Sequence, residues 1–106
     1  MGAISLVMVT VGNGEEAFSI ARTLVEEKLV ACVNIVRRVR SIYRWKGEIC
    51  DEEEQLLIMK TRSELYPALQ DRIHKLHSYE VPEIISFPVA DGLPDYLDWV
   101  VDSTSL

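Results

Sequence analysis

The chain has 106 residues, a length that suits one hydrophobic core, so we expect a single domain over residues 1–106. Hydrophobic residues make up 48% of it and charged residues 26%, a composition typical of soluble globular proteins and unlike that of disordered chains. Its 17 acidic and 11 basic residues give a net charge of −6, which disfavours nucleic acid as a partner.

The first predicted element is a strand over residues 4–11, ISLVMVTV. Its residues are apolar on both faces and rich in β-branched side chains, which is typical of a central strand. This is also the longest uncharged apolar run, far below the ~20 residues needed to cross a bilayer, and no basic segment leads into a signal-peptide core. We therefore expect a cytoplasmic protein with no membrane partner.

The next segments predict a helix and then a long hairpin. Residues 15–30 repeat apolar side chains at helical spacing, and Glu15 and Glu16 favour the positive end of this helix. Residues 31–45 change to a β pattern, Lys46 and Gly47 suggest a turn, and residues 54–62 return as a third strand. Acidic residues 52–54 are expected opposite Arg40 and its neighbours, which neutralises the basic cluster RRVRSIYRWK.

The last part of the chain predicts a helix, a strand and a closing helix. Ser63 can cap a helix over residues 63–77, in which Pro67 is tolerated because it falls in the first turn. Residues 83–91 are expected to form the fourth strand, and residues 93–103 a short terminal helix.

The order βαββαβ plus a terminal helix predicts an α+β fold, the ferredoxin-like sandwich. Two right-handed crossovers give the strand order 4-1-3-2, with the first two helices on one face. Strands two and four become the edges, and Pro88 supports this because proline cannot donate a ladder hydrogen bond. The second strand is longer than its neighbours, so its unpaired edge can pair with a neighbouring subunit.

Three features that can carry chemistry have simple structural explanations. GNGEEA, residues 12–17, matches the dinucleotide fingerprint G-x-G-x-x-A, but Glu15 and Glu16 would face the pyrophosphate, so a turn before a helix is the better interpretation. Cys32 and Cys50 lie 18 positions apart without a CxxC pattern, and we expect free thiols. Cys32 is predicted to be a small core residue, and Cys50 to be exposed near the hairpin tip.

HSYEVPEI, residues 77–84, fits less well with a plain turn. His77 at a helix end and Pro82 before a strand suit a turn, but a tyrosine and two glutamates around a proline are unusual there. His74 and His77 have a spacing that can chelate a metal on one helical face, although two surface histidines are the simpler interpretation. The residues alone leave both a turn and a site open.

Five segments together resemble the CutA divalent-cation tolerance proteins. In chain order these are EEKLVACVNI (26–35), SIYRWKGEI (41–49), LLIMKT (56–61), HSYEVPEI (77–84) and YLDW (96–99). They run over nearly the whole chain, and the aromatic hairpin, YEVPEI and YLDW are highly specific in that order.

The resemblance implies a ferredoxin-like subunit in a tight homotrimer, similar to the PII signalling proteins, with hairpins over residues 31–60 joining neighbouring subunits. It implies a cytoplasmic role in tolerance of copper and other divalent metals, with no established enzymatic activity. It further implies a cleft between subunits, lined by Tyr43, Trp45, Lys60, His77, Tyr79, Glu80, Glu83 and Trp99.

Metal binding is expected to be weak. Ser78 stands where the family commonly has proline, and Val9 and Leu76 stand where some bacterial relatives have a cysteine and a second histidine discussed as copper ligands. Tight copper or zinc sites need several Cys or His side chains at fixed spacing, which this chain does not offer. The expected ligands for copper or another divalent metal are His77, Glu80, Glu83 and Cys50.

Three functions are therefore compared. The first is a non-enzymatic homotrimer of divalent metal tolerance, and the second is a PII-like module that binds a small ligand or a partner protein in the intersubunit cleft. The third is an enzyme in which Lys60, Glu80 and Glu83 supply acid–base groups, but the sequence shows no strong nucleophile beside them. We expect the first, with the second as the alternative.

Overall fold

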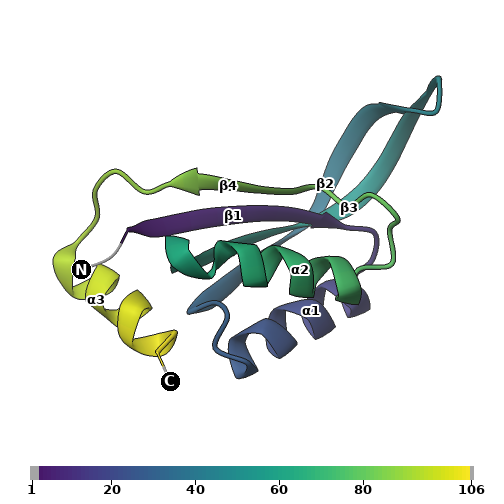
Figure 1. Ribbon diagram of the computed structural model, residues 1–106. Coiled ribbons are helices and arrows are strands. Elements are labelled where there is room, and N and C mark those ends of the chain that lie inside the picture. Colours follow the sequence, from purple (N-terminus) through teal and green to yellow (C-terminus); the bar gives the residue numbers. More distant parts are fainter. Residues whose placement is uncertain (1–2, 106) are drawn as a thin grey trace.

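The computed structural model describes residues 3–105 (Figure 1). Its elements are β1 (Ile4–Val11), α1 (Gly14–Glu26), β2 (Cys32–Trp45), β3 (Glu48–Arg62), a 3₁₀ turn (Ser63–Leu65), α2 (Tyr66–Leu76), β4 (Ile84–Pro88) and α3 (Pro94–Ser103). Across these residues no helix is both long enough and apolar enough to span a bilayer.

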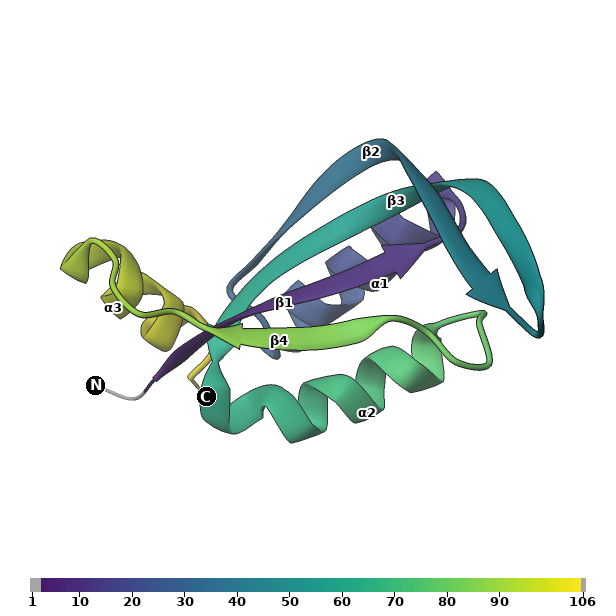
Figure 2. The ribbon, with the colours of Figure 1, turned by 90° about the horizontal axis from the view of Figure 1, so that it is seen from above.

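The four strands form one antiparallel sheet in the order β2-β3-β1-β4, which confirms the predicted α+β fold and strand order. Helices α1 and α2 lie on the same side of the sheet, while α3 sits at the end opposite the projecting hairpin (Figures 1 and 2). Pro88 is the last residue of the edge strand β4, where its missing N–H interrupts no inner ladder.

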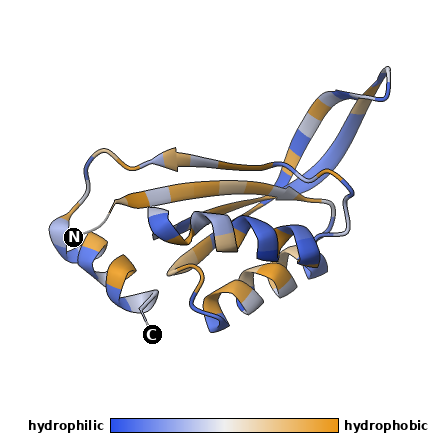
Figure 3. Cartoon of the chain, viewed as in Figure 1, coloured by the Kyte–Doolittle hydropathy of each residue, from blue (hydrophilic) through white to orange (hydrophobic). Residues whose placement is uncertain are grey.

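The hydrophobic core lies between the sheet and its two covering helices. Fully burying an aliphatic side chain contributes roughly 1.5–3 kcal/mol, so this layer is the main source of stability. In Figure 3, β1 is the strand with the most continuous hydrophobic colouring. The core residues come from β1 (Val7, Val9, Val11), α1 (Ala17, Ile20, Leu24), the segment after it (Val30), β3 (Leu57, Met59) and α2 (Leu69, Ile73).

The opposite face of the sheet is also apolar. Side chains alternate between the faces of a strand, so the residues between the core positions of β1 and β3 point away from α1 and α2. Four of them are large and apolar, and each is only half-buried: Leu6, Met8, Leu56 and Ile58. The apolar pattern on both faces of β1 is typical of a strand buried on both sides, but within this chain only the face toward α1 and α2 is fully covered.

Helix α1 ends four residues before the predicted boundary. Lys28 adopts a left-handed conformation with φ of 60°, and the N–H of Leu29 donates to the carbonyl of Leu24 while that of Lys28 donates to Val25. These bonds form a Schellman motif, which closes a helix by satisfying its last carbonyl groups. The apolar periodicity continues through residue 30 because Leu29 and Val30 still pack on the core, outside the helix.

Helix α2 begins later than predicted, and Ser63 does not cap it. A 3₁₀ turn occupies residues Ser63–Leu65, and Pro67 lies in the first turn of the α-helix, as expected. The hydroxyl of Ser63 forms a 2.6 Å hydrogen bond with that of Ser5 in β1. Ser63 therefore ties the start of this segment to the sheet.

The hairpin confirms the predicted turn but contains a bulge that the sequence did not predict. Lys46 and Gly47 have φ of 50° and 82°, which two-residue hairpin turns of type I′ require. Between Val36 and Val39 the register shifts, and Arg38 has φ of 63°. Beyond the bulge the strands continue to the tip, which projects well past the rest of the sheet (Figure 1).

The charge pairing in the hairpin follows the prediction in register but not in partner. Arg40 lies opposite Glu53 in the ladder, whereas its guanidinium forms a two-pronged ion pair with Asp51, at 2.6 and 2.8 Å. This pair lowers the pKa of Asp51, through the hydrogen bond from Arg40. Glu52 and Glu54, which were expected to share in neutralising the arginines, lie on the other face.

Candidate functional site

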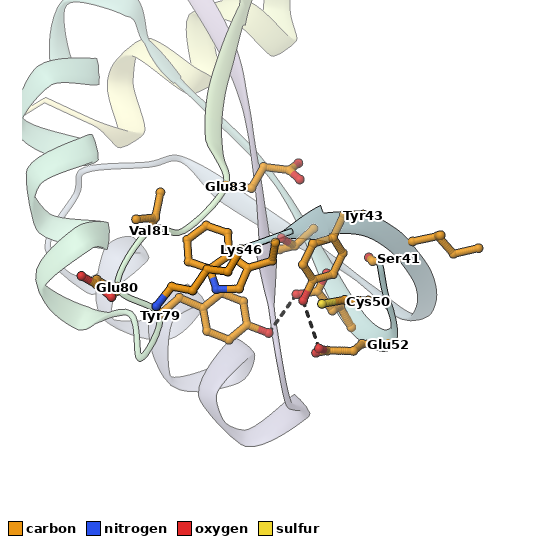
Figure 4. Close-up of a pocket in the computed structure, with 13 residues that line it drawn as sticks. Ser41, Tyr43, Lys46, Cys50, Glu52, Tyr79, Glu80, Val81 and Glu83 are labelled. Atoms are coloured by element: carbon orange, nitrogen blue, oxygen red, sulfur yellow. Dashed lines mark hydrogen bonds between the residues drawn. The ribbon is translucent and has the colours of Figure 1, made fainter. Parts of the chain in front are cut away.

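A cavity of about 660 Å³ lies between the distal hairpin and the loop of residues 77–83 (Figure 4). This volume is in the range of small-molecule sites. Its walls combine aromatic, aliphatic and acidic side chains. The lining residues are Thr10, Ser41, Ile42, Tyr43, Trp45, Lys46, Cys50, Glu52, Glu54, Tyr79, Glu80, Val81 and Glu83.

One face of the hairpin supplies six of the thirteen residues that line the cavity. Residues that lie opposite each other in an antiparallel ladder share a face, as do residues two apart on one strand. Tyr43 pairs with Cys50 and Ser41 with Glu52, so the whole alternating set turns toward the loop. The set comprises Ser41, Tyr43 and Trp45 from β2, with Cys50, Glu52 and Glu54 from β3.

Glu54 and Tyr79 join the two walls of the pocket. The Tyr79 hydroxyl donates a 2.9 Å hydrogen bond to Oε2 of Glu54, whose side chain lies at the base of the hairpin with 4% of the residue exposed. Burial, and then the bond to Glu54 and its negative charge, raise the pKa of Tyr79 well above its usual range. Tyr79 therefore remains a hydrogen-bond donor at every physiological pH.

Gly12 makes room for the Tyr79 ring. A Cβ atom at this position would lie 2.9 Å from the Tyr79 hydroxyl oxygen and 3.5 Å from two ring carbons. Real Cβ atoms do not approach a rigid ring so closely without displacing it. The first glycine of the GNGEEA segment thus serves the placement of Tyr79, and the neighbouring Asn13 caps α1 by accepting from the Glu16 N–H at 2.9 Å.

Two further contacts order the hairpin wall. The Tyr43 hydroxyl donates to Oε1 of Glu52 at 3.0 Å, and burial followed by this bond raises the pKa of Tyr43 to about 12. The Lys46 ammonium lies 5.8 Å from the centroid of the Trp45 ring, within the range of a cation–π contact. On this wall β2 thus supplies the aromatic groups and β3 the acidic groups, and Tyr43 lies beside Glu52 (Figure 4).

His77 is buried at the C-terminal end of α2 and its ring is fully used. Its Nδ1 accepts the Tyr79 N–H at 3.0 Å, so the proton resides on Nε2, which donates to the Thr10 carbonyl at 2.8 Å. Neither nitrogen is open to a metal, and the ring does not line the pocket. The arrangement of the His77 ring therefore does not support its predicted role as a metal ligand. The interpretation of two surface histidines is also corrected, since only His74 is exposed.

Ser78 holds the start of the loop by two hydrogen bonds to Glu16. Its N–H donates to Oε2 of Glu16 and its hydroxyl donates to Oε1, both at 2.8 Å. A proline has neither donor. The loop is therefore fixed to the first turn of α1 by hydrogen bonds rather than by a rigid ring.

The other predicted metal ligands line the pocket without forming a closed site. Cys50 is half-buried in the pocket wall rather than exposed, and Glu80 and Glu83 lie on the loop side. Within residues 3–105, no three His, Cys, Asp or Glu side chains converge as metal ligands. Val9 is fully buried in the core and Leu76 packs against it, so both positions are apolar packing.

Lys60 and Trp99 lie at the other end of the molecule. Lys60 is ten residues from Cys50 along β3, about 33 Å at 3.3 Å per residue, and its ammonium binds Oδ1 of Asn34. Trp99 belongs to α3, where it stacks against Tyr96 at 5.5 Å between centroids. Within one chain, neither residue reaches the pocket that holds Tyr43, Trp45, Tyr79, Glu80 and Glu83.

The α3 end has its own thiol contact. The Cys32 sulfur lies 3.5 Å from the Tyr96 hydroxyl, and this bond, followed by burial, raises the pKa of Tyr96 to about 12. Cys32 is half-buried rather than a core residue, and both cysteines are free, as predicted.

Sequence reasoning missed several members of the pocket, above all Glu52 and Glu54. It treated them only as partners of the arginines. The signal that finds them is the pairing about the Lys46–Gly47 turn, which places positions 43 and 50, and 41 and 52, directly opposite each other. Lys46, at the turn, and Val81, in the loop of residues 77–83, carry no such signal, because their place in the pocket depends on how the hairpin and the loop face each other.

The fold and the pocket together define a small α+β protein whose ligand-sized cavity is held between an extended hairpin and a loop. Residues 5–103 match the family model described as CutA1 divalent ion tolerance protein, and the chain belongs to this family. It is 48% identical over 99 residues to the divalent-cation tolerance protein CutA of Thermus thermophilus, covering 93% of this chain and 96% of that one.

Solved structures of relatives have the same fold. The Thermus thermophilus structure aligns with a TM-score of 0.93 at 47% identity, over 96% of this chain and 99% of that chain. CutA1 from Oryza sativa aligns with a TM-score of 0.95 at 41% identity, over 98% of this chain and 95% of that chain. These alignments confirm the predicted ferredoxin-like architecture with its long hairpin.

Some relatives are longer than this chain. It is 46% identical over 99 residues to human protein CutA, covering 93% of this chain but only 55% of the human protein. A relative from Archaeoglobus fulgidus is described as periplasmic and one from Arabidopsis thaliana as chloroplastic. A cytoplasmic location for this chain therefore stays a prediction.

Proposed function

We propose that this chain is a non-enzymatic homotrimer of divalent metal tolerance, copper included, that binds metal ions weakly. Membership of the CutA1 divalent ion tolerance family over residues 5–103 is the observation that carries this proposal. The relatives named above are called tolerance proteins or CutA, and none of these names is that of an enzyme.

Self-assembly is supported by the apolar surface of the single chain. The sheet face opposite α1 and α2 is lined by large apolar side chains that are only half-buried, and the hairpin projects beyond its neighbours. Ile42 and Ile49 on this hairpin are 67% and 70% exposed. Contiguous apolar surface and open strand edges of this kind mark interaction sites between chains.

Light scattering coupled to size exclusion tests the assembly and should give three times the 12.1 kDa chain mass. Ile49→Glu should lower that mass, because it places a charge in the proposed hairpin interface. Phe18→Glu is the matched control, since Phe18 is 60% exposed on α1, outside the hairpin. A monomeric parent protein, or equal effects of both variants, would refute assembly through residues 31–60.

Metal binding is proposed to use the pocket side chains Cys50, Glu80 and Glu83. Its affinity is expected to be weak, because among residues 3–105 of one chain no three ligands converge. His77 takes part only if its ring leaves both of its hydrogen bonds. Calorimetric titration of the reduced, metal-free protein with copper and zinc should give affinity weaker than micromolar that falls in Cys50→Ser. Tight stoichiometric binding that is unchanged in Cys50→Ser would show that other ligands are used.

A second candidate function is a PII-like module that binds a small ligand, and the cavity of about 660 Å³ favours it. In the proposed trimer, Lys60 and Trp99 join this cavity only from a neighbouring copy, since they lie at the far end of their own chain. A thermal-shift screen against metals, nucleotides and metabolites should then reveal a ligand that raises the apparent stability. A trimer that no compound stabilises would leave metal tolerance as the better interpretation.

A further inference from the structure

We propose that the pocket binds an organic cation, a small amine or quaternary ammonium compound, with the ammonium group between Glu54 and the aromatic wall. This inference rests on the second candidate function and names the ligand class of that site. The lining contains four carboxylates, on Glu52, Glu54, Glu80 and Glu83, and one ammonium group, on Lys46. Even with Lys60 added from a neighbouring copy, carboxylates outnumber ammonium groups by two to one.

Of the pocket carboxylates, Glu54 is the buried one, and it lacks a counter-ion among the described residues. Glu54 is 4% exposed, yet within residues 3–105 no lysine, arginine or histidine forms an ion pair with it. Its Oε2 accepts from the Tyr79 hydroxyl, whereas Oε1 accepts no hydrogen bond from the described residues and is not completely buried. Because a buried charge without a counter-ion is costly, binding a cation at this oxygen is favourable.

The rest of the lining favours an organic cation over a metal ion. A divalent metal needs several converging oxygen, nitrogen or sulfur ligands, and the described residues offer no group of three. Tyr43 and Tyr79 already donate their hydroxyl hydrogens to Glu52 and Glu54, so what they offer a ligand is chiefly ring surface. Val81 adds aliphatic surface suited to methyl and methylene groups.

A cation–π contact of this kind already exists within the pocket, between Lys46 and Trp45. The Lys46 ammonium lies 5.8 Å from the centroid of the Trp45 ring, and both residues line the pocket. Aromatic faces attract cations most when the cation is weakly hydrated, as an alkylated ammonium is compared with a lysine. Lys46 is exposed at the turn, so it can move aside for a ligand with a better fit.

Choline and its uncharged carbon isostere, 3,3-dimethyl-1-butanol, are suitable probes because they differ in charge but hardly in shape. Binding is measured on the full chain in its native assembly by calorimetry. It is followed in parallel by tryptophan fluorescence in Trp99→Phe, which keeps an aromatic ring at position 99 and leaves Trp45 as the single tryptophan. Calorimetry of this variant checks that its affinity equals that of the parent. Choline should bind and quench Trp45, and the isostere should bind at least about tenfold more weakly.

Glu54→Gln removes the charge but keeps an acceptor for Tyr79, and it should weaken choline binding about tenfold. Glu53→Gln is the matched control, because it makes the same change in net charge on the opposite face of the hairpin and should leave binding unchanged. Trp45→Leu, at an exposed position that the core does not need, should weaken binding by a similar factor. Equal binding of choline and the isostere, or equal effects of the two glutamine variants, would overturn the proposal.

The same assay separates this proposal from the function on which it rests. If nucleotides or acidic metabolites quench Trp45 while choline does not, the pocket is a ligand site and the cation class is wrong. If choline is displaced by zinc in the parent protein but not in Glu54→Gln, both cations use Glu54, which supports the proposed position of the charge. If no compound of any class binds, both the cation proposal and the ligand-binding function fail.

Discussion

Replacing Tyr79 with phenylalanine should destabilise the protein by about 1.5–3 kcal/mol, the range for a hydrogen bond to a charged group. The variant removes the donor of the 2.9 Å bond to Oε2 of Glu54 and leaves this carboxylate, in a residue 4% exposed, without a partner on that oxygen. The ring itself stays, so its packing is preserved.

Urea unfolding at a fixed protein concentration measures this cost as a lower midpoint with an unchanged slope. Tyr66→Phe is the control, because its hydroxyl donates at 2.8 Å to the exposed Gln70 and reaches the Ile84 carbonyl only at 3.5 Å. It should cost less than about 0.5 kcal/mol. In a Glu54→Gln background the acceptor is neutral, so Tyr79→Phe should cost only about 0.5–1.5 kcal/mol. Equal costs for Tyr79→Phe and Tyr66→Phe would refute a stabilising role for the bond to Glu54.

Three further predictions concern Tyr79, Gly12, which lies against its ring, and Ser78, which precedes it. Burial and Glu54 raise the pKa of Tyr79, so the stabilising contribution of its hydroxyl is complete below about pH 10 and is lost as pH rises through the raised pKa. The difference in unfolding free energy between the parent and Tyr79→Phe should therefore shrink above about pH 10. A larger difference above that pH would contradict this prediction. Gly12→Ala should cost about 1–3 kcal/mol in urea unfolding because its Cβ meets the Tyr79 hydroxyl at 2.9 Å, whereas Gly14→Ala, with nothing within 4 Å, should not destabilise. Ser78→Ala should cost about 0.5–1.5 kcal/mol in the same assay, since the hydroxyl bond to α1 is lost and the N–H bond remains; no change would show that the N–H bond alone fixes the loop.

The elements that could be predicted from the sequence are those whose local residue pattern is enough to indicate their conformation and burial. The bounds of β1 agree with its apolar run, and the positive φ angles at Lys46 and Gly47 agree with the predicted turn. The end of α1 could not be predicted, because Lys28 adopts a left-handed conformation that glycine usually provides at that position. Tertiary packing of Leu29 overrides the local preference there.

The role of His77 could not be read from its position either. A histidine at the end of a helix is equally consistent with a surface residue, a metal ligand or a structural hydrogen-bonding group. What decides between them is the Thr10 carbonyl, 67 residues earlier in the chain, which accepts from Nε2 at 2.8 Å. Contacts over such sequence separations depend on the sheet register and leave no mark in the local pattern.

The bulge between Val36 and Val39 bears on why sequence reasoning missed Glu52 and Glu54 as pocket residues. Before it, odd-numbered residues of β2 pair with odd-numbered residues of β3, as Val33 does with Met59, and so share the face of the core. Across it, β2 advances by three residues while β3 advances by two, so Tyr43 comes to lie opposite Cys50. One extra residue thus transfers the odd-numbered aromatic residues of β2 to the face that carries the even-numbered glutamates of β3. Arg38 adopts a left-handed conformation at this bulge, and an arginine gives no indication of it in the sequence. Pairing from the Lys46–Gly47 turn alone therefore does not tell which face of the sheet the pocket wall continues.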